Sequence, residues 1–142
     1  LDLGKVYEAY LEILVSSKRV IGISPIYHPD YVQAVAMLLT QGNTVELILT
    51  SAVLNKIVST VKMDQLKGAV EAGTLKIYLQ ENIKLALTVT EKNFSLGLFN
   101  LNGEYDDRMD LVGVDLNSIQ WGEELFREYL KNSRRITLEN IG

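Results

Sequence analysis

Residues 20–50 read VIGISPIYHPDYVQAVAMLLTQGNTVELILT and place two β-branched segments on either side of an apolar helix pattern. The segments Val20–Ile23 and Thr44–Thr50 are typical of strands buried on both faces. The almost wholly apolar run Tyr31–Leu39 between them predicts a helix that packs against a core. This strand, helix, strand order predicts two parallel strands joined by a right-handed crossover.

Local signals mark the ends of this helix. Pro29 suits the first helical position, with His28 or, one turn further in, Asp30 as the capping residue. The tripeptide Gln41-Gly42-Asn43 ends the helix, because glycine readily adopts the left-handed conformation that follows a helix. The helix is therefore expected to fill the whole space between the two strands.

The same alternation continues as far as residue 79. Thr50 or Ser51 can cap a second helix, which carries the apolar residues of 53–61. A third, short helix is predicted over Met63–Ala72, and a third strand over Leu75–Leu79. The first half is therefore a βαβαβ arrangement, which predicts a parallel sheet covered by helices.

The second half changes period. Apolar and other residues alternate over 83–90 and again over 94–98, with a turn near 91–93, which predicts an antiparallel hairpin. Asn102-Gly103 is a strong signal for a second hairpin, because both central residues of a type I′ turn need positive φ. The fold class expected is α/β, with a mixed sheet flanked by helices.

Helices also open and nearly close the chain. Leu3, Tyr7, Tyr10 and Leu14 form an apolar stripe, so residues 1–16 are expected to be a connecting or dimerisation helix, which either packs on its own domain or pairs with a second copy. The compact domain is expected at 17–132, with a polar tail at 133–142. Its last helix, capped by Asp115 or Asn117, is expected to pack on the sheet through three aromatic residues, Trp121, Phe126 and Tyr129.

Composition excludes several classes of function. The 142 residues carry a net charge of −4, the wrong sign for a domain that follows nucleic-acid phosphates by itself. The chain has no cysteine, which excludes thiolate chemistry, and one histidine, so any Ser-His-Asp triad would need His28 as its base. No apolar run approaches the roughly 20 residues that span a bilayer, so a cytoplasmic protein is expected.

No metal or other cofactor is predicted. The stretch 105–110 holds three aspartates, but their spacing is not that of a calcium-binding EF-hand loop. A solvated turn is the interpretation we favour for this stretch.

The candidate ligand-binding residues follow the three parallel strands. Ligands of such sheets collect beyond the carboxyl ends of the strands, which meet at one edge. Free N–H groups at the helix starts near Asp30 and Thr50 would suit an anionic ligand. The candidates taken from these loops are Ser24, Tyr27, His28, Asp30, Thr50, Ser51 and Asn82.

Four segments of the chain resemble a known family. They are 25–31 (PIYHPDY), 45–50 (VELILT), 85–101 (LALTVTEKNFSLGLFNL) with Gly103, Tyr105 and Asp106, and 121–126 (WGEELF) with Tyr129. Together they resemble the middle, or effector, domain of the methanogenesis regulatory protein family, which are archaeal winged-helix transcriptional regulators. The resemblance implies a homodimer that contacts DNA only through a winged helix outside this chain.

A more distant resemblance is to phospholipase D-like folds. In those folds a His-x-Lys dyad precedes an apolar strand, and here the comparable residues are Asn82 and Lys84. Asparagine cannot act as the covalent nucleophile, so the resemblance implies a scaffold that has lost its phosphodiester chemistry. Lys84 joins the candidate ligand-binding residues on this basis.

The hypothesis is a non-catalytic domain that senses a small molecule and dimerises, within a transcriptional regulator. A sensor needs two states that bind the effector unequally. Two alternatives stay open at this point. One is a small esterase or phosphodiesterase that uses His28, and the other is a protein-interaction module without a ligand.

Overall fold

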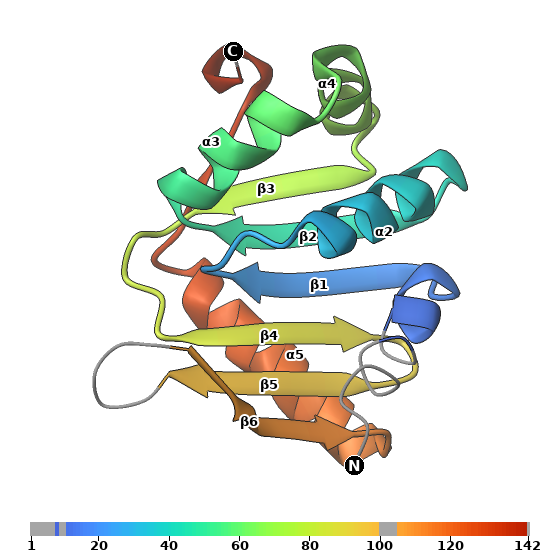
Figure 1. Ribbon diagram of the computed structural model, residues 1–142, viewed down its shortest axis with the longest axis vertical. Helices are drawn as coiled ribbons and strands as arrows, with labels where there is room; N and C mark the ends of the chain where they lie inside the picture. The colour runs from blue at the N-terminus through green and yellow to red at the C-terminus, as the bar shows by residue number, and fades with distance from the viewer. Residues whose placement is uncertain (1–7, 9–10, 100–104, 142) are drawn as a thin grey trace.

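The computed structural model describes residues 8, 11–99 and 105–141. Its helices are α2 (Pro29–Thr40), α3 (Ser51–Thr60), α4 (Met63–Ala72), α5 (Leu116–Leu130) and the short 3₁₀ helix η1 (Leu138–Asn140). Its strands are β1 (Arg19–Ser24), β2 (Thr44–Leu49), β3 (Leu75–Leu79), β4 (Leu85–Thr90), β5 (Phe94–Phe99), β6 (Tyr105–Gly113) and β7 (Arg134–Arg135). Within the described residues these strands form one sheet, in the order β6-β5-β4-β1-β2-β3-β7, and Figure 1 labels all of them except β7.

The centre of the sheet is parallel, as predicted. β1 pairs with β2 and β2 with β3, with Val20 beside Val45 and Val45 beside Leu75. All three valine and leucine side chains are buried, because they face the core beneath the helices α2, α3 and α4. The βαβαβ prediction is therefore confirmed.

The antiparallel half extends the sheet from the other side of β1. β4 pairs with β1 and with β5, and β5 pairs with β6, so both hairpins are present. The Asn102-Gly103 turn lies outside the described residues.

The solvated turn expected over 105–110 is wrong, because these residues belong to β6. An edge strand tolerates a polar sequence, since one side of it faces solvent. Between Leu96 and Leu98 of β5 the pairing changes register, and this irregularity accommodates the extra residues of β6.

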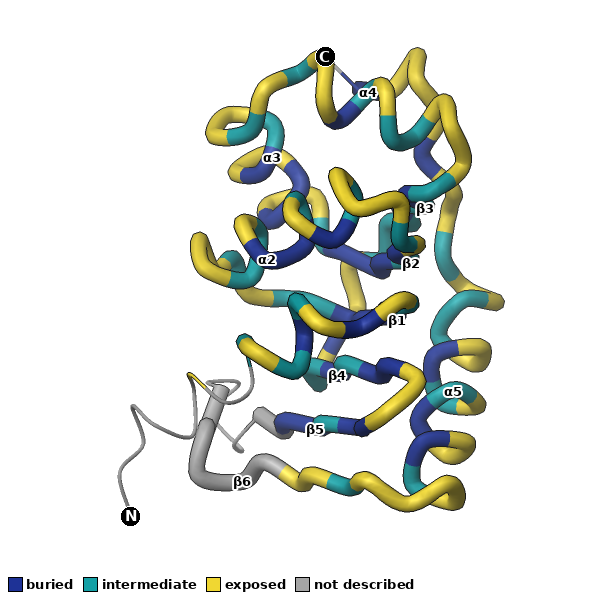
Figure 2. The backbone as a smooth tube through the Cα atoms, turned by 90° about the vertical axis from the view of Figure 1, so that its right-hand side faces the viewer, coloured by how far each residue is buried: buried dark blue, intermediate teal, exposed yellow. Residues whose placement is uncertain are grey.

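Two layers of helix enclose the sheet. Figures 1 and 2 show α2 and α3 on one face and α5 on the other. Successive side chains of β1 point to opposite faces of the sheet: Val20 packs in the core beneath α2, and Ile21 packs in the core beneath α5. Both side chains are fully buried.

Helix α5 begins as the sequence predicts. The Asp115 carboxylate accepts a hydrogen bond from the Ser118 backbone N–H at 3.1 Å, which caps the helix. Phe126 is fully buried against the sheet, whereas Trp121 is half exposed and meets the Phe94 ring edge-on, with 5.6 Å between centroids. Along the described chain, no helix has the length and apolarity to cross a membrane.

Both ends of the described chain add to the core on the α2 side. Residues 11–15 are helical and bury Leu14 there, so the part of the 1–16 helix that is described packs on its own domain. The remainder of that helix lies outside the described residues. At the other end β7 pairs antiparallel with β3, and Ile136 and Ile141 are buried, although the sequence predicts only a polar tail.

Candidate functional site

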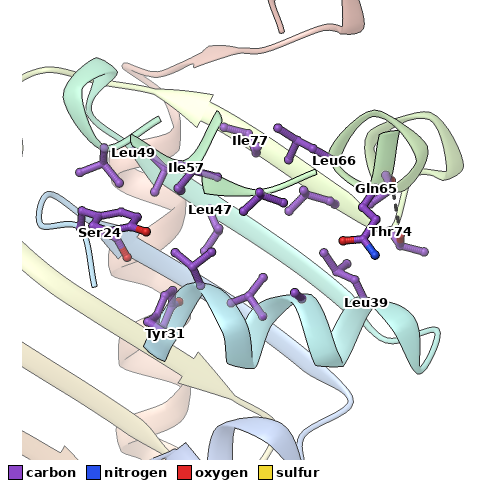
Figure 3. Close-up of a pocket in the computed structure, with 18 of the residues that line it drawn as sticks. Ser24, Tyr31, Leu39, Leu47, Leu49, Ile57, Gln65, Leu66, Thr74 and Ile77 are labelled. Atoms are coloured by element: carbon purple, nitrogen blue, oxygen red, sulfur yellow. Dashed lines mark hydrogen bonds between the residues drawn. The ribbon is translucent and has the colours of Figure 1, made fainter. Parts of the chain in front are cut away.

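An apolar groove lies over β2 and β3, with α2 along one side and α3 and α4 along the other (Figure 3). Its volume is about 370 Å³, and small-molecule sites are typically about 300–1,000 Å³. The groove exists because small residues face it from two helices, Ala36 on α2 and Gly68, Ala69 and Ala72 on α4. Larger side chains at these positions would close the space.

The groove has an apolar middle. Its lining there comes from five elements: Val32, Val35 and Leu39 of α2, Leu47 and Leu49 of β2, Val53 and Ile57 of α3, Leu66 of α4, and Leu75 and Ile77 of β3. The strand residues among them are almost fully buried. Such a lining attracts apolar surface, which gains free energy when it leaves water.

Polar groups gather at one end of the groove, where β1 leads into α2. Ser24 and Tyr31 lie at this end in Figure 3. The Tyr31 ring approaches β1 closely, since a Cβ on Gly22 would lie 2.7 Å from its hydroxyl oxygen. A side chain at position 22 would therefore displace Tyr31.

The Tyr31 hydroxyl is buried and has no partner in hydrogen-bonding geometry. Burial raises the pKa of Tyr31 from 10.0 to about 12, and the nearby side chains of Thr88 and Ser24 oppose this shift only in part. The phenol is therefore neutral at physiological pH, so it can donate a hydrogen bond to an acceptor that enters the groove.

Tyr27 links the two walls at the same end. Its hydroxyl lies 3.1 Å from the Thr60 hydroxyl, at the last residue of α3, and the Lys56 ammonium lies 5.8 Å from the centre of its ring. The loop between β1 and α2 is thus tied to α3. The Tyr27 side chain belongs to the lining of the groove.

His28 also lines the groove but does not cap α2 with its side chain. It occupies the N-cap position, with Pro29 first in the helix as predicted, yet the structure has no side-chain capping bond there. Its backbone carbonyl accepts the Val32 N–H at 3.1 Å. Asp30 lies inside the first turn, where its negative charge complements the helix dipole.

A second, polar cleft lies where β2 and β3 end. It is lined by Ser51, Leu79, Gln80, Glu81, Asn82, Asn132 and Arg134. The Glu81 carboxylate accepts hydrogen bonds from the Ser51 hydroxyl and, at 2.8 Å, from the Ser51 backbone N–H. These two bonds, the hydroxyl first, lower the pKa of Glu81. The Gln80 amide is also engaged, because it donates to the Tyr129 carbonyl at 2.9 Å.

The N–H groups at the start of α3 are therefore not free. Ser51 N–H is bound to Glu81, and Val53 N–H donates to the Thr50 hydroxyl at 3.3 Å, so Thr50 is the predicted cap. The expectation of free N–H groups near Thr50 is wrong for these two. An anion at this position would compete with a carboxylate of the chain itself.

The structure divides the predicted site residues between the two pockets. Ser24, Tyr27 and His28 lie together in the groove, and Ser51 and Asn82 lie in the polar cleft. Asp30, Thr50 and Lys84 line neither. Sequence reasoning missed Tyr31 as a member of the groove, and it missed the apolar lining, whose residues have the same pattern as core residues. The small residues of α2 and α4 were the available signal.

The positions that the two catalytic interpretations single out, His28 and Asn82, lie in different pockets, although Ser24 lines the groove together with His28. His28 lines the groove, whereas Asn82, which stands where phospholipase D-like proteins have histidine, lines the polar cleft. Among the described residues, no three histidine, aspartate or glutamate side chains could share a metal ion. The side chains of 105–110 lie outside that description.

Comparison with solved structures supports the fold. TrmBL2, described as an archaeal chromatin protein, superposes with a TM-score of 0.72 and 12% identity over 90% of this chain and 49% of its own. The phospholipase D family member Nuc from Salmonella typhimurium superposes with a TM-score of 0.66 and 10% identity, over 92% of this chain and 90% of its own. At these identities the likeness establishes a phospholipase D-like fold alone.

Sequence comparison goes further. This chain is 28% identical over 136 residues to the methanogenesis regulatory protein FilR1 of Methanothrix harundinacea (strain 6Ac). That alignment covers 93% of this chain but 30% of the relative, so the chain spans about a third of the relative's length. Residues 3–132 match the family described as the middle domain of methanogenesis regulatory protein FilR1, and this chain belongs to that family.

Proposed function

We propose that this chain is the non-catalytic middle domain of a transcriptional regulator and binds a small-molecule effector in the apolar groove. The family supports a regulatory role, since its namesake is a methanogenesis regulatory protein. The observation that carries the sensing role is the groove itself, about 370 Å³ in volume and bounded by three separate helices. A groove of this size leaves apolar side chains in contact with water, and a ligand that covers them gains free energy.

The groove is suited to transmit a signal. An effector can shift an equilibrium between two conformations only if it binds them unequally. The walls of the groove are three separate helices, α2, α3 and α4. A ligand that binds more tightly when these helices lie closer together, or farther apart, therefore binds the two conformations unequally. The Tyr27 hydroxyl, which bonds Thr60 across the two walls, is a contact that such a movement would break.

Loss of catalysis is supported by two residues. The chain has one histidine, and it lies after β1 rather than at Asn82, where a phospholipase D-like nucleophile would stand. Removal of the nucleophile removes covalent catalysis on this scaffold. The alternative, an esterase or phosphodiesterase that uses His28, predicts hydrolysis of generic esters that His28→Ala abolishes.

DNA is contacted, in this proposal, by a part of the regulator outside this chain, in the cytoplasm. The net charge of −4 disfavours contact between this domain and phosphates. TrmBL2, described as having a novel mode of DNA binding, is related to this chain in fold alone.

We also propose that two copies pair through the β6 edge. Leu111 and Val112 of β6, with Val114 and Leu116 beyond it, are 57–73% exposed. β6 is an edge strand nine residues long, so it can pair antiparallel with the same strand of a second copy about a two-fold axis. Light scattering should then give a dimer, which Val112→Lys dissociates and the exposed Gln120→Lys does not. A wild-type monomer at high concentration would contradict this.

The experiment that tests effector binding is a thermal-shift screen of metabolites on two variants of α2. A ligand of the native state raises the melting temperature by mass action. Ala36→Phe fills the groove and should abolish the shift, whereas Gln33→Phe, at an exposed position outside the lining, should keep it. A shift that survives Ala36→Phe places the effector elsewhere. No shift from any metabolite favours the ligand-free interaction module.

A further inference from the structure

The lining of the groove carries almost no charge. None of its residues is lysine, arginine, aspartate or glutamate, and the structure describes every one of them. His28, which is exposed, is the only lining residue with a basic side chain, and the Lys56 ammonium, 5.8 Å from the centre of the Tyr27 ring, belongs to a residue outside the lining. An anion that left water for the middle of this groove would lose hydration without meeting a counter-charge, which is costly.

The groove is also elongated. It follows β2, from the end where the Val45 N–H donates to the Thr74 carbonyl to the end where Leu49 lies beside Ser24. Four residue steps of a strand separate Val45 from Leu49, a length of about 13 Å. Figure 3 shows the labelled lining residues spread along this length, with Ser24 and Tyr31 at one end and Gln65 and Thr74 at the other.

Polar groups are confined to the two ends. At the end marked by Gln65 and Thr74, the Thr74 hydroxyl is already engaged, since it donates to the Ala69 carbonyl at 3.3 Å. At the opposite end, the Tyr31 hydroxyl lies close to Ser24 and is buried without a partner in hydrogen-bonding geometry. A ligand oxygen that accepted a bond from Tyr31 would remove the cost of that unpaired hydroxyl.

We infer that the effector is a neutral, elongated and mainly hydrocarbon molecule, which carries a carbonyl-type oxygen at the Ser24 and Tyr31 end. This inference rests on the proposed function, because it names the chemistry of the ligand for the same groove. It differs from the anionic ligand that the helix starts suggested. The apolar chain supplies affinity, and the single oxygen sets the direction in which the molecule lies.

The test measures competition against the neutral dye N-phenylnaphthylamine, whose fluorescence rises in apolar sites, on the 142-residue chain. Straight-chain methyl ketones from heptanone to undecanone displace the dye. Each added methylene should tighten binding by about fourfold until the groove is full. The carboxylates of equal chain length, heptanoate to undecanoate, should bind at least about tenfold more weakly.

Matched variants locate the site. Ala36→Phe, which fills the groove, should weaken every ketone by at least about tenfold, and Gln33→Phe on the same helix should change nothing. Tyr31→Phe should weaken ketones but not alkanes, because only ketones offer an acceptor. If Ala36→Phe fails to fold, Gly68→Leu takes its place, since a Cβ at Gly68 meets no atom within 4 Å.

The outcomes separate the inference from the proposal beneath it. If carboxylates bind as tightly as ketones, or if affinity does not rise with chain length, the neutral hydrocarbon class is overturned. Metabolites whose thermal shift disappears in Ala36→Phe would still leave the groove as an effector site. If Ala36→Phe blocks the binding of neither the dye nor any metabolite, then the inferred ligand class and the proposed effector site are both overturned.

Discussion

Tyr31→Phe removes one buried oxygen and should stabilise the ligand-free domain. A buried polar group without a partner costs about 1–3 kcal/mol, and the Tyr31 hydroxyl has none in bonding geometry. Ser24 and Thr88 lie near enough to oppose the rise in its pKa, so we expect the lower end of that range. A gain of about 1 kcal/mol in the free energy of unfolding would raise the melting temperature by roughly 3–4 °C in a domain of this size.

The same residue predicts an alkaline loss of stability. Burial raises the pKa of Tyr31 to about 12 in the folded state, from an ordinary value of 10.0. Between these values the unfolded chain loses the proton while the native protein keeps it, so stability falls as the pH rises. The loss reaches about 2–3 kcal/mol at the upper value. Tyr31→Phe should lack this component, although the other tyrosines titrate in both proteins.

Urea unfolding at neutral and alkaline pH measures both effects. Tyr27→Phe is the matched control, because it makes the same chemical change where the hydroxyl does have a partner, Thr60 at 3.1 Å. It should destabilise the domain by about 0.5–1 kcal/mol. Should Tyr31→Phe instead lower stability by about 1 kcal/mol or more at neutral pH, the hydroxyl is a satisfied donor and the reasoning is refuted.

Three further substitutions test the packing and the helix ends. Phe126→Ala should cost about 3–5 kcal/mol, since this α5 ring is fully buried against the sheet, and a fall in the urea midpoint would measure it. Thr50→Ala should cost about 1 kcal/mol, because the Val53 N–H loses its cap, and calorimetry would detect the lower melting temperature. Gly73→Ala should cost about 1–2 kcal/mol, because φ is 80° there, and an unchanged unfolding curve would contradict that value.

The parallel half of the sheet could be predicted because its signals are local. β-branched runs gave β1 and β2 to within a residue at each end, and α4 covers the predicted Met63–Ala72. Proline and glycine mark the limits of these elements, since their backbone preferences act without help from the rest of the fold. Thr50 and Asp115 cap their helices for the same reason.

Non-local features escaped prediction. β7 consists of two arginines that become a strand only because β3 lies beside them, and Ile136 and Ile141 are isolated apolar residues in a polar segment. β6 is likewise held by its pairing with β5 rather than by its own composition. The β-propensity of a segment does not show which strand will pair with it in the fold.

The candidate site shows the same limit. The strand-end rule placed Ser24, His28 and Ser51 near pockets, but it could not show that these residues belong to two of them. The groove arises where small residues of α2 and α4 face each other across two strands. Residues so distant in sequence meet only in the fold, and their apolar pattern alone describes a filled core equally well.

The bond between Glu81 and the first residue of α3 acts as a built-in competitor. Phosphates and nucleotides favour helix starts of this kind, and here they would have to evict a carboxylate that the chain itself supplies. Glu81, whose pKa the bonds from Ser51 lower below its ordinary value, is negatively charged at neutral pH and repels an incoming anion. We therefore expect added inorganic phosphate to leave the melting temperature of the domain unchanged.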